Sequence, residues 1–105
     1  MSPSDTHLFG VDYLFEIRNA PMHLTGAEVA RIFDEAFFNG TVCVEELSVD
    51  QPRTSKTFRV LFEAHRNRLI HNFADRVREE GAVLLEWGDE RLNVSLLSCD
   101  MVYWD

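Results

Sequence analysis

An α+β fold built on one antiparallel sheet is the architecture that this 105-residue sequence predicts. Five segments alternate apolar and polar residues at the period of a β-strand, and two amphipathic segments with recognisable ends have the period of a helix. The length is typical of one domain, and a hydrophobic content of 46% is ordinary for a globular protein. We therefore expect a single domain over residues 1–105, without an internal linker.

The first strand and the first helix have the clearest signals. The segment VDYLFEIR, residues 11–18, alternates strictly and predicts a strand with one buried face. In the following segment, LTGAEVARIFDEAFFNG, the apolar side chains fall on one helical stripe. Thr25 and Glu28 match a capping box at its start, and Asn39-Gly40 supplies a left-handed stop at its end.

The next two segments predict a hairpin. In TVCVEELSV the alternation slips, because Val44 and Leu47 have opposite parity, and a β-bulge near Glu45-Glu46 would restore one buried face. The segment KTFRVLFEA, residues 56–64, alternates cleanly. The intervening DQPRTS has the composition of a turn, so we expect the two strands to pair.

A second helix and two further strands follow. The segment NRLIHNFADRVREEG has an apolar helical stripe, with Asn67 as a possible N-cap and Gly81 as the stop. The segments AVLLEW and RLNVSLL, residues 82–87 and 91–97, then flank the turn GDE and predict two strands. The predicted order of elements is β-α-β-β-α-β-β.

This order resembles the split βαβ arrangement of ferredoxin-like sandwiches, with an extra C-terminal strand. Both helices are then expected on one face of the antiparallel sheet, with the first and third strands in its centre. The other face would be mostly polar, and three leucines on adjacent strands would form a small apolar stripe there. These candidate sheet-face contact residues are Leu14, Leu61 and Leu84.

The C-terminal stretch SLLSCDMVYWD is unusually apolar for the end of a chain. Its alternation continues past Leu97, which predicts that it runs as strand rather than as a loose tail. Both sides of such a strand are apolar, so we expect both to be covered. Either the tail docks on its own domain, or it forms an interface with another chain.

The net charge of −8 constrains the partners. It disfavours direct binding to nucleic acid or to an anionic membrane, because phosphate contacts need an excess of basic residues. An acidic surface fits a basic protein better, and a homodimer is a further possibility. No run is long and apolar enough to span a membrane and the N-terminus lacks the pattern of a signal peptide, so we expect a cytoplasmic location. There, Cys43 and Cys99 would stay thiols.

Motifs for chemistry are missing from the sequence. It has no clustered metal ligands, no nucleophile elbow and no phosphate-binding glycine loop. His71 and Asp75, one helical turn apart, could form an ordinary pair. The strand KTFRVLF resembles the base-stacking strand of RNA-recognition modules, but Thr57 and Arg59 replace its two glycines and Phe58 belongs to the core face. We therefore predict no enzyme activity, no metal and no cofactor.

A small acidic interaction protein is the function that these observations favour. Acidic residues near the end of the first helix and on the following strand are expected to converge, while the aromatic tail supplies anchors. The candidate partner-binding residues are Asp34, Glu35, Glu45, Glu46, Asp50, Met101, Tyr103 and Trp104. We expect an inhibitor-like role, of the immunity-protein, antitoxin or phage-antagonist kind, that occludes a basic surface of a nucleic-acid-handling partner. The alternatives are a solvated surface without a partner, a homo-oligomeric domain that binds a small molecule, or a structural subunit of a larger assembly.

Overall fold

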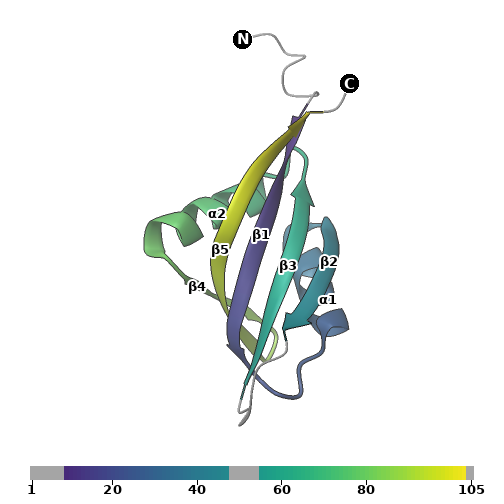
Figure 1. The fold of residues 1–105 in the computed structure, drawn as a ribbon, viewed down its shortest axis with the longest axis vertical. Helices are drawn as coiled ribbons and strands as arrows, with labels where there is room; N and C mark the ends of the chain where they lie inside the picture. The colour runs from purple at the N-terminus through teal and green to yellow at the C-terminus, as the bar shows by residue number, and fades with distance from the viewer. Residues whose placement is uncertain (1–8, 48–54, 104–105) are drawn as a thin grey trace.

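The computed structural model of this chain describes residues 9–47 and 55–103 (Figure 1). All seven predicted elements are present, in the predicted order. They are β1 (Phe9–Ala20), α1 (Gly26–Phe37), β2 (Thr41–Leu47), β3 (Lys56–Ala64), α2 (Arg68–Glu80), β4 (Val83–Trp87) and β5 (Glu90–Tyr103). The prediction of an α+β fold with one antiparallel sheet is confirmed.

Both helices pack on the same face of the sheet. Phe15 on β1 is completely buried, and its ring centroid lies 5.7 Å from that of Phe33 on α1 and 5.8 Å from that of Phe73 on α2. Phe58 and Phe62 bring β3 into the same core. Because these large apolar side chains are removed from water between two layers, they provide the main driving force for folding.

The helix ends match the local signals in the sequence. At the start of α1, Thr25 Oγ1 accepts from the Glu28 N–H, and Glu28 Oε1 accepts from the Thr25 N–H, which confirms the capping box. The left-handed stop begins one residue earlier than expected, at Phe38 with φ 59°, and continues through Asn39 and Gly40. The predicted caps of α2 are confirmed by the Asn67 side chain and by Gly81, with φ 84°.

The strand order is β2-β3-β1-β5-β4, and this corrects one expectation. The last strand, β5, lies beside β1, while β4 occupies the edge (Figure 1). Leu84 on β4 is therefore opposite Asn93 of β5, and β5 lies between Leu84 and the strand that carries Leu14. The prediction that Leu84 lies on a strand adjacent to Leu14 is wrong. The physical reason is strand length, since the 14-residue β5 pairs with β1 from Phe9 to Arg18, whereas the 5-residue β4 is too short to do so.

The sequence also predicted a β-bulge near Glu45-Glu46, and this prediction is wrong. The β2–β3 register runs without a break from Cys43↔Leu61 to Leu47↔Thr57, and its irregularity lies earlier, between Thr41 and Cys43. Leu47 thus lies on the opposite face from Val44. An edge strand buries few side chains on either face. The register of β2 is therefore set by its pairing with β3, and the apolar pattern of β2 has little influence on it.

The C-terminal stretch runs as strand through Tyr103, as predicted. Its backbone pairs with β1 from Leu14↔Ser98 to Phe9↔Tyr103, after a register shift between Leu14 and Phe15. The chain itself does not cover Met101, which is 54% exposed. Coverage of this side of the strand by another chain stays a prediction. Trp104 lies outside the described residues. Among the described helices, none combines the length and apolar character that a membrane span requires.

Candidate protein-binding surface

The sheet face turned away from α1 and α2, here called the open face, carries side chains in rows across the strands. Each row follows from the antiparallel register, which places one residue of β1 between its partners on β3 and β5. Three neighbouring rows differ in character: one is charged and internally paired, one is apolar and one is acidic. Together they define the candidate surface.

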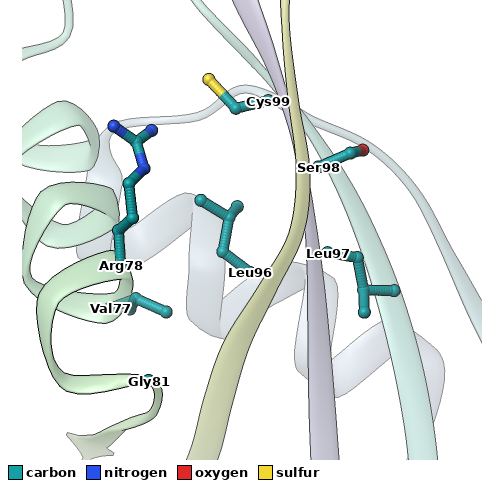
Figure 2. Close-up of a pocket in the computed structure, with 7 residues that line it drawn as sticks. All are labelled: Val77, Arg78, Gly81, Leu96, Leu97, Ser98 and Cys99. Carbon is teal, nitrogen blue, oxygen red and sulfur yellow. The ribbon is translucent and has the colours of Figure 1, made fainter.

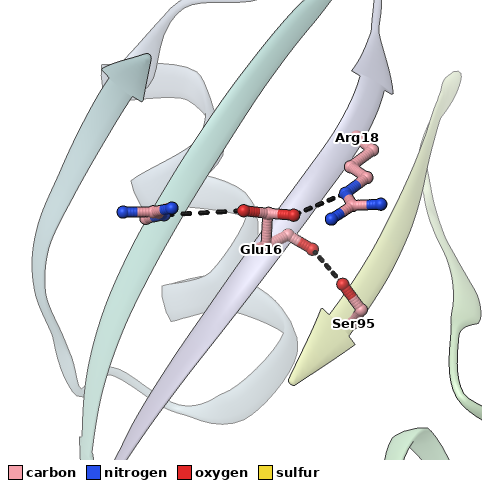
Figure 3. Close-up of polar contacts among 4 residues, drawn as sticks. Glu16, Arg18 and Ser95 are labelled. Atoms are coloured by element: carbon pink, nitrogen blue, oxygen red, sulfur yellow. Dashed lines mark hydrogen bonds and ion pairs between the residues drawn. The ribbon is translucent and has the colours of Figure 1, made fainter. Parts of the chain in front are cut away.

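The first row is centred on Glu16, which is only 5% exposed although it lies on the open face. Its carboxylate accepts from Arg18 Nε and, at 3.5 Å, from Arg59 Nε, while the Ser95 hydroxyl donates to its backbone carbonyl oxygen at 3.3 Å (Figure 3). In register, Glu45 on β2 lies opposite Arg59. The carboxylate at the centre of this row is therefore satisfied within the chain, so the row serves mainly to hold β3, β1 and β5 together.

The second row is apolar. Leu14 lies opposite Leu61, which confirms the expected adjacency for two of the three predicted leucines, and both residues are partly buried. Leu97 on β5 is the extra residue at the register shift, its side chain points to the open face beside this row (Figure 2), and the residue is 43% exposed. Ser98 is thus the residue opposite Leu14 on β5, and Leu97 adjoins this position, where the sequence had placed Leu84.

The third row is acidic and is the most unusual feature of the face. Asp12 on β1 lies directly opposite Glu63 on β3 and directly opposite Asp100 on β5. We call these three residues the acidic row. His65 contacts Glu63 at 3.1 Å, but Asp12 Oδ1 is buried and has no hydrogen-bond partner among the described residues. Like charges directly opposite each other on a sheet oppose folding, so the row costs stability instead of adding it.

The acids predicted from sequence do not converge in this way. Asp34 Oδ1 accepts from the Thr41 N–H at 3.0 Å, which joins α1 to β2, and Glu35 accepts from Trp87 Nε1 at 2.9 Å. Glu46 pairs with Lys56 at 3.3 Å. Being adjacent on one strand, Glu45 and Glu46 point to opposite faces of the sheet. Asp50 lies outside the described residues.

The acidic row was missed because it depends on register. The alternation of residues 11–18 and 56–64 already places Asp12 and Glu63 on the outer face. Their adjacency, and the approach of Asp100 from the other side, require the β1–β3 and β1–β5 pairings. The expected tail strand contained the missing signal, since Asp100 alternates with Cys99 and Met101.

A groove borders this surface at the outer edge of β5. It has a volume of about 320 Å³ and separates the C-terminal part of α2 from β5 (Figure 2). Val77 and Leu96 supply apolar lining, and Arg78 and Cys99 point toward each other across it (Figure 2). Leu97 and Ser98 point away from the groove, toward the open face (Figure 2).

A polar pair lies next to this groove at the end of the core. The hydroxyl of Tyr13 is 2.6 Å from Nδ1 of His71, and Cys99 faces Tyr13 across the strands. Burial, with the nearby Cys99 thiol and Asp75, raises the pKa of Tyr13 to about 12, and burial lowers the pKa of His71. Because Tyr13 is only 4% exposed, this hydroxyl has little access to a substrate, and its evident role is to satisfy His71.

Within the described ranges, no group of His, Cys, Asp or Glu side chains is arranged to hold a metal ion. Comparison with known proteins found no matching family, no similar curated protein and no similar solved structure.

Proposed function

We propose that this chain is a small, non-catalytic interaction module that binds a basic protein through its open face. The acidic row carries this proposal. A lysine or arginine from a partner would neutralise the repulsion among Asp12, Glu63 and Asp100, so binding would recover free energy that the free chain has lost. Like charges directly opposite each other on neighbouring strands are destabilising, and a basic partner that relieves this repulsion would gain affinity.

The adjoining leucine row supports the same role. Charge alone speeds the encounter and selects the partner, whereas affinity needs desolvated apolar contact. Leu14, Leu61 and Leu97 lie one row from the acids, and Leu97 is 43% exposed. A basic side chain flanked by apolar ones is therefore the complementary pattern.

An inhibitor-like protein that occludes a basic, nucleic-acid-binding surface is the finer form of the proposal, and the net charge of −8 supports it. We also propose a ferredoxin-like topology for the fold, with β4 added at the edge. In support, β2, β3 and β1 are neighbours in that order and β5 lies antiparallel beside β1.

The test is to neutralise the acidic row without changing its shape. Partners are captured at low salt from an extract of the source organism, identified and purified, and then titrated with the chain by calorimetry. We expect the double variant Asp12→Asn, Asp100→Asn to bind the partner about tenfold more weakly or worse, and to lose part of the salt dependence.

The matched control is Glu79→Gln with Glu80→Gln on α2, which removes the same charge from the helix side of the molecule. It should leave the affinity close to that of the unmodified chain. If both double variants weakened partner binding equally, the loss of affinity would come from net charge alone, and a binding site on the open face would be refuted.

A further inference from the structure

We infer that the segment of the partner that contacts this chain is extended and adds to the sheet as a new strand beside β5, with basic and apolar side chains in alternation. This inference rests on the proposed function and adds the conformation and the pattern of the bound segment. The geometry of β5, the groove beside it and the charges on its two sides each contribute a step.

The first step concerns the outer edge of β5. One edge of this strand pairs with β1 from Arg18↔Asn93 to Phe9↔Tyr103. The other edge pairs with β4 only from Trp87↔Glu90 to Val83↔Val94, which leaves residues 95–103 without a second strand among the described residues. In Figure 1 the upper part of β5 accordingly forms the border of the sheet. Such an edge presents backbone N–H and C=O groups that an extended peptide can pair with.

The second step concerns the space beside that edge. The groove follows β5 at Leu96 and Cys99, and Val77 on α2 lines its opposite wall (Figure 2). Neighbouring strands lie about 4.8 Å apart, so an added strand would place every second side chain over this groove. Apolar side chains suit this side, because Val77 and Leu96 are apolar and the positive charge of Arg78 disfavours another cation there.

The third step concerns the opposite side of the same added strand. Its remaining side chains would lie on the open face beside Ser98 and Asp100, at the end of the acidic row. Basic side chains suit that position because they would neutralise the repulsion among the acids of the acidic row. A second copy of this chain fits poorly, because it would bring Asp100 and a net charge of −8 against the same acids. The pattern therefore points to a basic segment from a different protein.

The probe is a synthetic peptide of alternating lysine and valine, with blocked termini and the length of residues 96–103. It is added to the isotopically labelled full chain, and binding and amide hydrogen exchange are measured by NMR. We expect the outward-pointing amides of residues 96–103, every second one, to exchange rapidly in the free chain and to become protected on binding. A glutamate–valine peptide of the same length should not bind.

The decisive control is the same lysine–valine peptide with N-methyl groups along one backbone edge. It keeps the charge and the side chains but cannot form the ladder, so we expect its affinity to fall at least tenfold. Equal binding of the methylated peptide, or binding without new protection, would overturn strand addition. The proposed function would still stand if Asp12→Asn, Asp100→Asn weakened binding of the purified partner. Failure of the unmethylated peptide to bind would likewise overturn strand addition. Titration of the purified partner with the Asp12→Asn, Asp100→Asn variant would still test binding through the open face.

Discussion

Tyr13 is the polar end of an otherwise apolar core. Its ring stacks near Phe15, with ring centroids 5.7 Å apart, and its hydroxyl meets Nδ1 of His71 at 2.6 Å. The tautomer of His71 decides the direction of this hydrogen bond: the hydroxyl donates to an unprotonated Nδ1, or an Nδ1–H donates to the hydroxyl oxygen. Neutral tyrosine and neutral histidine can form either arrangement. Burial favours the same neutral forms, because it raises the pKa of Tyr13 and lowers the pKa of His71.

The pair predicts a stability profile that declines at both ends of the pH range. The unfolded chain loses the tyrosine proton near pH 10, whereas the folded chain keeps it to about pH 12, so stability falls as the pH rises from 10 to 12. His71 has a lowered pKa, so its contribution is present above about pH 6.5 and is lost as the pH falls below that value.

Chemical denaturation across pH, compared between the unmodified chain and Tyr13→Phe, measures this effect. The variant should be about 1 kcal/mol less stable at neutral pH because it loses one hydrogen bond. It should also lose the part of the alkaline decline that comes from Tyr13. Identical alkaline profiles for the two proteins would contradict the assigned role of the hydroxyl.

Single residues differ in how well sequence predicts them. Thr25, Glu28 and Asn67 were predicted as caps because a cap acts on backbone groups within one helical turn. Asp12 and Glu63 were placed on the outer face by alternation alone. Their meeting with Asp100 depends on residues far apart in the chain, so no local pattern contains it.

At the scale of the element, β5 carries two roles along its length. Its first part, with Leu92 and Val94 fully buried, closes the core under α2. Its second part pairs with the start of β1 while Cys99 and Met101 remain exposed. The tail is therefore docked through its backbone as far as Tyr103, whereas the side chains of Cys99 and Met101 are left exposed by the chain itself. An interface with another chain at these side chains stays a prediction.

Truncation after Leu97 separates these roles. It removes the β1 pairing from Leu14↔Ser98 onward but leaves the buried phenylalanines in place. We expect cooperative unfolding to persist with a free energy of unfolding lower by about 3 kcal/mol, from several net backbone hydrogen bonds at about 0.5–1.5 kcal/mol each. Thermal and urea denaturation provide the measurement. Binding of the lysine–valine peptide should disappear, and a truncated chain that still bound it would show that the β5 edge is not the site.

β2 shows why the apolar pattern of an edge strand is a poor guide to which of its faces is buried. The side chains of Val42 and Val44 suggested one buried face, yet Val42 is 55% exposed. With a neighbour on one side only and α1 covering it partly, β2 takes its register from β3. The alternation of β1 and β3 was reliable because both strands are buried under the helices.

At the scale of the whole molecule, the number and order of elements followed from the sequence, but the strand order did not. Local patterns cannot tell which strand of the β4–β5 hairpin pairs with β1, because both have apolar residues at alternate positions. The choice is made by the length of β5 and by its continuation along β1. That choice moves Leu84 to the edge, brings Leu97 to the leucine row and completes the acidic row with Asp100.

The same arrangement predicts a monomer. The open face and the β5 edge both contain Asp100, so pairing of two copies through either surface would place like charges together. We expect sedimentation equilibrium at low salt to give a mass near 12.2 kDa. Added salt screens repulsion between exposed charges, so any weak self-association should increase with salt, whereas capture of a basic partner should decrease. A stable dimer at low salt would contradict this prediction and favour the homo-oligomeric alternative, in which the open face lines a pocket between subunits.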